Sequence, residues 1–183
     1  MSKIFLSSDL HFNHNKPFIY EPRGFSSIEE MNEGIIKNFN AILTWEDTLY
    51  LCGDQMLGMD MQAGLALLRR LNGNKYLVIG NHDTDNRIQA YRESGIFIEV
   101  QPQYRIKYKG RIYLITHYPT LVENEGEFNN VINIHGHTHC KNHLSEIPYC
   151  YNVNVDAWNC MPVELDYIHN EGLKLWSHKK EIE

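Results

Sequence analysis

The stretch INIHGHTHCKNH, between residues 132 and 143, contains four histidines and begins within an apolar run. Imidazole nitrogen is a common ligand of divalent metal ions. The stretch is therefore either a solvated polar loop that is rich in histidine or a row of metal ligands. It lies well inside the chain, which rules out a terminal purification tag. The residues that follow the other apolar runs distinguish the two interpretations.

Polar side chains follow five apolar runs of the sequence, at the point where each run ends. In α/β proteins, ligands gather at the carboxyl ends of strands, so five such runs together predict a site. Residues two apart in an extended chain point to the same side, which lets Asp9 and His11, like His137 and His139, aim together. The candidate ligands are Asp9, His11, Asp54, Asn81, His117, His137 and His139.

The types of these side chains indicate the kind of metal. Carboxylate, amide and imidazole groups together suit borderline divalent ions, of which we favour Mn, with Fe, Zn, Co and Ni as alternatives. If each ion takes about four ligands, seven residues can hold two ions when one carboxylate bridges them, and Asp54 is the expected bridge. Two ions about 3.5–4 Å apart would clamp a phosphoryl group and generate hydroxide from bound water. Glycines 53, 80 and 136 would let the backbone turn sharply or approach a ligand closely.

The fragments DLH, GD, GNHD, a single His117 and GHTH occur in the order and at the strand-end positions of calcineurin-like metallophosphoesterases. The chain resembles this family from Asp9 to His139. The resemblance implies a four-layer α/β/β/α sandwich, and a hydroxide that bridges two metals and attacks phosphorus in line. It implies one metal set of Asp9, His11, Asp54 and His139, and a second set of Asp54, Asn81, His117 and His137.

The resemblance also places His82 beside the scissile phosphate, where it would stabilise charge or protonate the leaving oxygen. The residue type agrees with this role, because histidine is the natural general acid near neutral pH. Asp83 could orient His82, although adjacent side chains of an extended strand diverge.

One departure narrows the function. Protein phosphatases of this family carry Asp-Arg-Gly residues just after the GD fragment, whereas here Gln55 to Gly58 follow it. The chain is also too short for a large fused specificity domain, so it resembles the small bacterial or phage-type phosphoesterases. We expect a metal-dependent hydrolase of phosphodiesters, and secondarily of monoesters, with a small or nucleotide-type substrate. The alternatives are a catalytically silent scaffold that binds proteins and a metal-storage site; the complete ligand set and His82 favour the enzyme.

Several residues outside the ligand set have two interpretations each. His14 and Arg23 lie on the loop after the first strand. They would either contact the substrate, with the guanidinium of Arg23 forming two hydrogen bonds to a phosphate, or be solvated loop residues. Tyr118 could stack on a base or sugar or be an ordinary tyrosine, and Asp156 could hold a ligand histidine. Four other histidines are expected outside the ligand set. His135 is expected to support the ligands, and His143, His169 and His178 are expected at the surface.

The elements that must position these residues follow from hydrophobic periodicity. Strands are predicted at residues 3–8, 48–52 and 75–79, and helices begin near Ser27, near Asp60 and after Asp83. The second half is strand-rich, with a hairpin turn at 109–110. This pattern predicts one α/β domain, residues 1–183, of two packed mixed sheets flanked by helices. The first helix has Ser27 and Glu30 at capping-box spacing and an expected buried face of Ile28, Met31, Ile35, Phe39 and Ile42.

Composition excludes several classes of protein. The 183 residues are 43% hydrophobic and 22% charged, which is typical of globular proteins. A net charge of −6 argues against binding long nucleic acid, and the absence of an apolar run near 18 residues argues against a membrane protein. The N-terminus does not have the pattern of a signal peptide, and the four cysteines form no CxxC pair. We therefore expect reduced thiols in a cytoplasmic protein, with zinc binding by Cys140 and Cys150 as the alternative.

Overall fold

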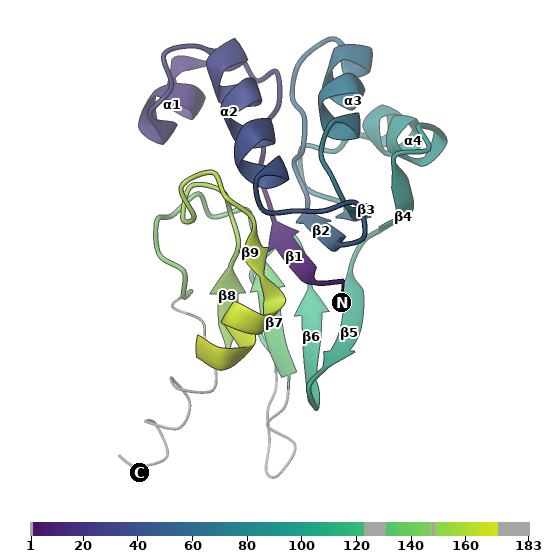
Figure 1. Cartoon of the computed structure of the whole chain (residues 1–183), viewed down its shortest axis with the longest axis vertical. Coiled ribbons are helices and arrows are strands. Elements are labelled where there is room, and N and C mark those ends of the chain that lie inside the picture. Colours follow the sequence, from purple (N-terminus) through teal and green to yellow (C-terminus); the bar gives the residue numbers. More distant parts are fainter. Residues whose placement is uncertain (1, 123–130, 146, 148, 172–183) are drawn as a thin grey trace.

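Two mixed β-sheets form the centre of the fold (Figure 1). The computed structural model describes residues 2–122, 131–145, 147 and 149–171. The first sheet has the order β4-β3-β2-β1-β9, with β1 to β4 parallel and β9 antiparallel to β1. Its strands are β1 (Ile4–Ser7), β2 (Thr48–Cys52), β3 (Asn74–Val78), β4 (Phe97–Gln101) and β9 (Val163–Glu164).

The second sheet has the order β5-β6-β7-β8. Strands β5 and β6 form the predicted hairpin, and Lys109 and Gly110 in its turn have φ angles of 45° and 81°. Two consecutive left-handed residues are typical of the type I′ turn, whose twist matches that of the strands. Strands β6, β7 and β8 are parallel. The four strands are β5 (Tyr104–Tyr108), β6 (Arg111–Ile115), β7 (Val131–His135) and β8 (Cys150–Asn152).

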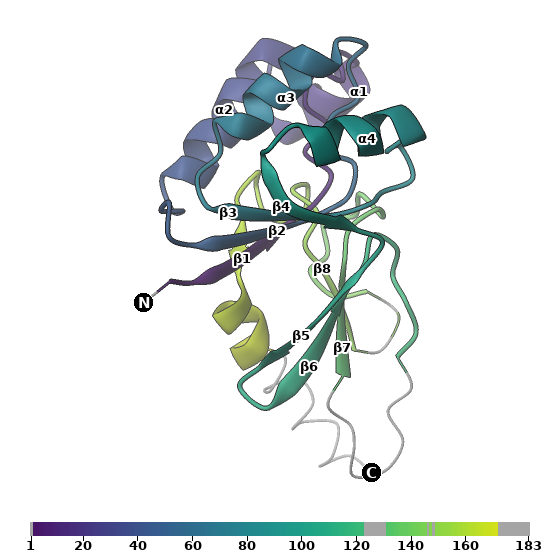
Figure 2. The ribbon, with the colours of Figure 1, turned by 90° about the vertical axis from the view of Figure 1, so that its right-hand side faces the viewer.

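Helices α1 to α4 lie on one side of the first sheet, and the second sheet lies on its other side (Figure 2). Residues 165–171 are also helical and lie beside the second sheet (Figure 2). The predicted α/β class, with two mixed sheets and flanking helices, is confirmed. None of the described helices is long and apolar enough to cross a membrane. The helices before β4 are α1 (Pro17–Tyr20), the 3-10 helix η1 (Glu21–Arg23), α2 (Ile28–Asn40), α3 (Met61–Arg69) and α4 (Asp85–Glu93).

Helix α2 begins as predicted but ends earlier. The hydroxyl of Ser27 accepts a hydrogen bond from the backbone N–H of Glu30 at 3.1 Å, which satisfies one free donor of the first turn. The carboxylate of Glu30 accepts from the backbone and side chain of Ser26 rather than from Ser27. Because the helix ends at Asn40, Ile42 lies beyond it and is 40% exposed, so its predicted burial is wrong. Leu43 is buried in its place.

Alternation along the central strands divides the apolar residues between two cores. Phe5 of β1 packs with the helices, whereas its neighbour Leu6 packs between the sheets. Strands covered on both faces read as continuous apolar runs, as β2 does. Each such fully buried side chain contributes roughly 1.5–3 kcal/mol. This double burial fixes β1, β2 and β3 in register, so that their carboxyl ends meet at one edge.

Two histidines expected at the surface have partners instead. The ring of His169 is buried, and its Nδ1 lies 2.7 Å from the hydroxyl of Tyr113. His143 is half-buried and stacks on Trp158 with ring centroids 3.8 Å apart. His178 lies outside the described residues.

Candidate metal centre

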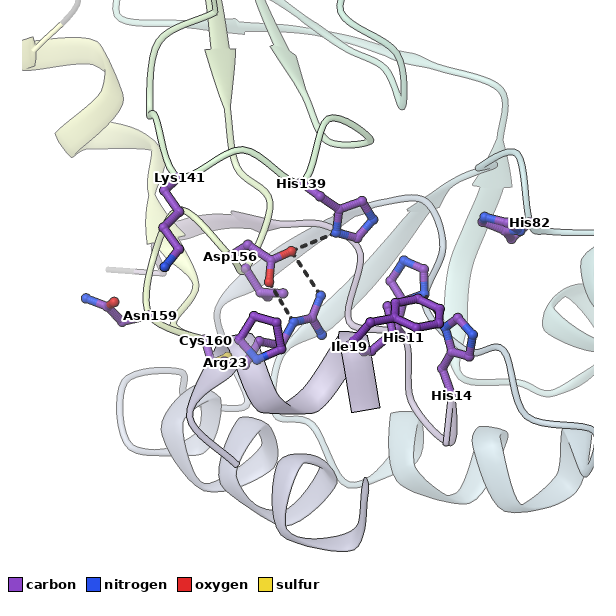
Figure 3. A pocket seen from close by; sticks show the side chains of 13 residues that line it. His11, His14, Ile19, Arg23, His82, His139, Lys141, Asp156, Asn159 and Cys160 are labelled. Carbon is purple, nitrogen blue, oxygen red and sulfur yellow. Dashed lines mark hydrogen bonds and ion pairs between the residues drawn. The ribbon is translucent and has the colours of Figure 1, made fainter. Parts of the chain in front are cut away.

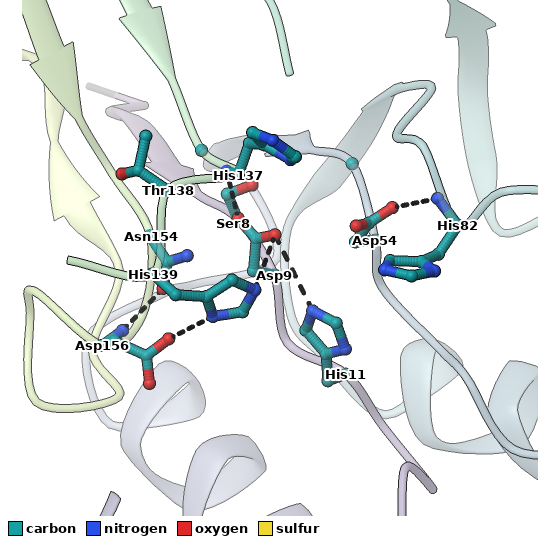
Figure 4. Close-up of polar contacts among 12 residues, drawn as sticks. Ser8, Asp9, His11, Asp54, His82, His137, Thr138, His139, Asn154 and Asp156 are labelled. Atoms are coloured by element: carbon teal, nitrogen blue, oxygen red, sulfur yellow. Dashed lines mark hydrogen bonds and ion pairs between the residues drawn. The ribbon is translucent and has the colours of Figure 1, made fainter. Parts of the chain in front are cut away.

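The predicted ligands meet where the two sheets adjoin. Asp9 follows β1 and Asp54 follows β2, and the backbone N–H of Asp9 donates to the carbonyl of Gly53 at 3.1 Å. In the second sheet, His117 follows β6 and His137 follows β7. The backbone N–H of His137 donates to Oδ2 of Asp9 at 2.9 Å, which ties the ends of the two sheets together. Figure 4 shows the side chains of Asp9, His11 and His139 turned towards one another.

The backbone at five of the seven ligands is left-handed, not extended as we expected from their two-residue spacing. Non-glycine residues rarely adopt positive φ, and each costs roughly 1–2 kcal/mol. Their concentration at one site indicates a functional constraint, because such strain persists only where the surrounding structure imposes it. The φ angles are 58° for Asp9, 53° for His11, 58° for Asp54, 68° for His137 and 49° for His139.

Asp9, His11 and His139 form a first ligand cluster. Oδ1 of Asp9 lies 3.8 Å from Nε2 of His11 and 3.6 Å from Nε2 of His139, distances too long for hydrogen bonds. Asp9 and His11 are almost fully buried, and neither Oδ1 of Asp9 nor Nε2 of His11 has a hydrogen-bond partner among the described residues. Burying a carboxylate oxygen and a ring nitrogen without partners is costly, and a cation among these atoms would remove the cost.

Asp54, Asn81, His117 and His137 form a second ligand cluster. Oδ1 of Asn81 lies 2.7 Å from Nε2 of His117 and 2.9 Å from Nδ1 of His137. Nε2 of His117 also lies 3.5 Å from Oδ2 of Asp54. Nδ1 of His117 is 2.8 Å from the carbonyl of Cys52, which assigns the ring proton to Nδ1 and leaves a lone pair on Nε2. The lone pair of Nε2 and the amide oxygen of Asn81 face the same space and could both bind a cation, so this cluster also fits a metal.

Two groups of ligand atoms lie close enough to hold metal ions. The ligand atoms of Asp9, His11 and His139 lie within 4.8 Å of one another, and so do those of Asp9, Asp54 and His117. Asp9 is common to both groups, whereas we expected Asp54 to bridge. Oδ1 of Asp54 accepts the backbone N–H of His82 at 2.9 Å, and its bridging role stays a prediction.

Asp156 holds His139 in place. Its Oδ2 lies 2.7 Å from Nδ1 of His139, and its Oδ1 accepts from Nε of Arg23 at 2.7 Å. Burial raises the pKa of Asp156, but the hydrogen bonds from His139 and Arg23 outweigh it and lower that pKa to about 2. Burial lowers the pKa of His139, yet the bond to Asp156 raises it overall. The ionised carboxylate therefore keeps the proton of His139 on Nδ1 and its lone pair on Nε2.

Arg23 has a different role from the predicted contact with substrate. Its Nη1 donates to the carbonyl of Leu10 and its Nη2 to the carbonyl of Asp9, both at 3.0 Å. Its Nε donates to Asp156, and only 2% of the side chain is exposed. The guanidinium therefore makes its hydrogen bonds within the protein. It supports the backbone around Asp9, and its geometry does not favour a bond to a phosphate.

Asp83 joins the segments that follow β2 and β3 and makes no hydrogen bond to His82 among the described residues. Its Oδ2 accepts from the backbone N–H groups of Gly80, at 2.7 Å, and Asp54, at 3.2 Å. Its Oδ1 accepts from the hydroxyl of Tyr91 at 3.0 Å. Burial raises the pKa of Asp83. The position of this residue in GNHD was visible in the sequence, but its backbone partners were not.

A cavity of about 550 Å³ opens beside the first ligand cluster (Figure 3). His82 lines it and is exposed, with its ring 5.9 Å from that of His11. His14 also lines it, with Nδ1 3.2 Å from Nδ1 of His11; burial, and then the neighbouring His11, lower the pKa of His14 to about 4. Tyr118 is half exposed and lies outside this cavity, with its ring 4.5 Å from that of His137.

Close packing around the ligands explains one of the predicted glycines. A Cβ atom at Gly136 would collide with Oγ of Ser8 and Oδ2 of Asp9. The neighbouring His135 is fully buried, and its Nδ1 lies 2.8 Å from the carbonyl of Gly136.

The described cysteines are free, and Cys52, Cys150 and Cys160 are buried.

Comparison with known proteins agrees with this geometry. The model of the calcineurin-like phosphoesterase family matches residues 2–183. The chain belongs to the calcineurin-like phosphoesterase family. Members of the family depend on metal and hydrolyse phosphoesters, and the two ligand clusters described above provide candidate metal sites.

Proteins similar to this chain come from several organisms. An uncharacterised protein of Methanocaldococcus jannaschii is 36% identical over 175 residues, which cover 92% of this chain and 90% of that protein. A protein of unknown function from Aquifex aeolicus is 26% identical and has a TM-score of 0.70 over 93% of this chain and 99% of its own. An archaeal phosphodiesterase is 17% identical, with a TM-score of 0.48 over 83% of this chain and 82% of its own.

Proposed function

We propose that the protein is a binuclear metal-dependent phosphodiesterase that acts on a small or nucleotide-type substrate. The observation that carries this proposal is the convergence of two ligand clusters at one edge, where Oδ1 of Asp9 and Nε2 of His11 are buried without partners. In a family of phosphoesterases, such a site is suited to polarise a phosphoryl group.

The two ions would be held by different sides of the site. When bound, they supply Lewis-acid activation of the phosphoryl group and an activated water molecule, and Mn is the favoured metal. One ion would be bound by Asp9, His11, Asp54 and His139, and the other by Asp54, Asn81, His117 and His137.

His82 would act on the leaving group. Its side chain is exposed in the cavity, and its backbone N–H is fixed by Oδ1 of Asp54 at 2.9 Å. A histidine so placed can donate a proton to the departing alkoxide or stabilise its charge. The segment that carries it is held by Asp83 through the N–H of Gly80.

The size of the cavity supports our choice of a diester over a monoester. A monoester needs space for one organic group, whereas a diester needs space for a second ester arm on the side away from the leaving group. The volume of about 550 Å³ beside the first ligand cluster provides that space.

The test combines metal analysis with a substrate screen. Protein loaded with Mn should contain two ions per chain and hydrolyse bis-p-nitrophenyl phosphate faster than p-nitrophenyl phosphate. The screen should then cover cyclic nucleotides, nucleotide diesters, short RNA and monoesters. Two bound ions without hydrolysis of any ester would favour the scaffold or storage alternatives.

A further inference from the structure

The cavity extends well beyond the ligand clusters. In Figure 3, His82 lies at one end of it and Lys141 and Asn159 at the other, with His11 and His139 between them. A phosphoryl group at the ligand clusters would fill only the middle of this space. The part towards Lys141 and Asn159 remains for a group attached to that phosphate.

The walls of the cavity have a mixed chemical character. Ile19 and Val155 are buried apolar residues that line the cavity, and Phe18 lines it while 68% exposed. The ring of Phe18 stands nearly perpendicular to that of His14, at 88° with centroids 5.8 Å apart. An exposed aromatic ring beside a cavity is a surface on which a planar ring of a ligand can stack.

The outer end of the cavity favours an anion. The side chain of Lys141 is exposed and has no ion pair or hydrogen bond within the described ranges. Asp156 is the only carboxylate among the described lining residues, and Arg23 and His139 already pair with it. The charge of Lys141 is therefore available to a ligand.

Asn159 provides a second polar group at this end. It has a positive φ of 51°, as does the following Cys160 at 57°, and its side chain is exposed on the cavity wall. Left-handed non-glycine residues are uncommon, and these two lie on the wall of the same cavity as His11 and His139. The amide can donate to a phosphate oxygen.

We propose that this cavity binds a nucleoside arm of the substrate that carries a second phosphate. The ring system packs against Phe18, and Lys141 and Asn159 bind the second phosphate at the outer end. This inference rests on the proposed function, because the phosphate at the ligand clusters is taken to be the one that is hydrolysed.

Two matched substrates test the proposal. Thymidine 5′-(p-nitrophenyl phosphate) and its 3′-phosphorylated counterpart share the scissile bond, and water cleaves each to p-nitrophenol and a thymidine phosphate. Protein loaded with Mn should have a kcat/KM about ten-fold higher for the 3′-phosphorylated ester, the effect expected of one charge-assisted hydrogen bond. The Lys141→Met variant should reduce this ratio to about one. The matched control, Lys107→Met, removes an exposed lysine of β5 and should retain the wild-type ratio.

A second variant tests the ring contact. Because Phe18 is largely exposed, Phe18→Ala should fold normally and raise KM for both thymidine esters by about ten-fold, without a comparable effect on methyl p-nitrophenyl phosphate. Equal kcat/KM of the wild type for the two thymidine esters, or an unchanged ratio in Lys141→Met, would overturn the proposal.

Calorimetry separates this proposal from the proposed function. Thymidine 3′,5′-bisphosphate should bind the wild type about ten-fold more tightly than it binds Lys141→Met, whether or not any ester is hydrolysed. Absence of turnover with retained, Lys141-dependent binding would contradict the hydrolase and support the cavity assignment. Hydrolysis of the esters together with equal binding of the bisphosphate by the wild type and Lys141→Met would contradict only the cavity assignment.

Discussion

Nδ1 of His139 lies 2.7 Å from Oδ2 of Asp156, a residue 17 positions later in the chain. Because this bond fixes the proton on Nδ1, it directs the lone pair of Nε2 towards Oδ1 of Asp9. Arg23 holds the same carboxylate from its other side and also bonds the backbone carbonyl of Asp9. The ligand His139, the carboxylate of Asp156 and the guanidinium of Arg23 thus form one hydrogen-bonded unit.

Removing the charge of Asp156 should weaken metal binding. We expect Asp156→Asn to lower the affinity for Mn by about 10–100-fold, because the partner of a ligand histidine sets its orientation and basicity. Calorimetric titration of chelator-treated protein measures this effect. Glu99→Gln, which changes an exposed carboxylate on β4, is the control and should bind as the wild type does. Equal affinities for all three proteins would show that Asp156 does not position His139.

The role of His82 can be separated from metal binding. His82→Ala should retain the full metal content, since the ligand atoms are on other residues. Its turnover of esters with poor leaving groups should fall by about 10²–10⁴-fold, while esters of p-nitrophenol should lose less. A series of aryl and alkyl diesters measures the difference. Equal losses across that series would contradict a proton-donating role.

Metal should stabilise the fold. Oδ1 of Asp9 is buried without a hydrogen-bond partner among the described residues, and a bound cation would compensate its charge. Each site should add about 2.7 kcal/mol to the free energy of unfolding when free metal is at 100 times its Kd. Melting curves with chelator and with Mn measure this. Asp9→Asn should lose the part of the Mn-dependent rise in Tm that comes from the ion it binds, yet melt no lower than the wild type in chelator; a rise as large as that of the wild type would contradict the ligand assignment.

Asp83 should matter to the fold through its acceptor oxygens. Asp83→Ala leaves three donors without their partner, so we expect it to lower the free energy of unfolding by about 3 kcal/mol. Asp83→Asn keeps an oxygen for the two backbone donors and should cost less than half as much. Tyr91→Phe, which removes only the hydroxyl, should cost about 1 kcal/mol. Urea unfolding compares the three, and equal losses for Ala and Asn would contradict this account.

Lys75 should give the stability a pH dependence that is independent of the metal centre. Burial lowers the pKa of this lysine in β3 to about 8, from its usual 10.5. Below pH 8 both folded and unfolded chains carry the charge, and the folded state bears the full cost of burying it. Between pH 8 and 10.5 the folded chain releases its proton first, so this cost is relieved as pH rises.

The variant Lys75→Met isolates that contribution. It should be more stable than the wild type at pH 7, and its advantage should shrink as the pH rises from about 8 towards 10.5. Chemical unfolding of metal-free protein at several pH values measures the difference. An advantage that does not change over this interval would contradict the burial of a charged Lys75.

Much of the site could be predicted because its signals are local. Apolar runs identify β1, β2 and β3, and Asp9, Asp54 and Asn81 come directly after them. Parallel strands end at one edge, so these residues had to lie together. The conformation that aims them could not be predicted from spacing, because an extended chain and a left-handed turn can present residues two apart equally well.

The errors concern partners far away in the sequence. Arg23 could be placed on a loop near the site, but its partner Asp156 lies 133 residues later. His169 is buried because Tyr113, 56 residues earlier, accepts or donates a bond to it. Ile42 continued the helical spacing, but α2 ends at Asn40. The spacing of residues predicts which side chains share one face of a helix or strand. It does not predict which distant element packs against that face, and the burial and partners of these residues depend on that packing.

The most direct test of the metal centre is hydrolysis of bis-p-nitrophenyl phosphate by chelator-treated protein during stepwise addition of Mn. Turnover should rise with added metal and level off at two ions per chain, and Asp54→Asn should remain inactive throughout. A wild-type protein that stays inactive at every ratio of Mn to chain would contradict the proposed function.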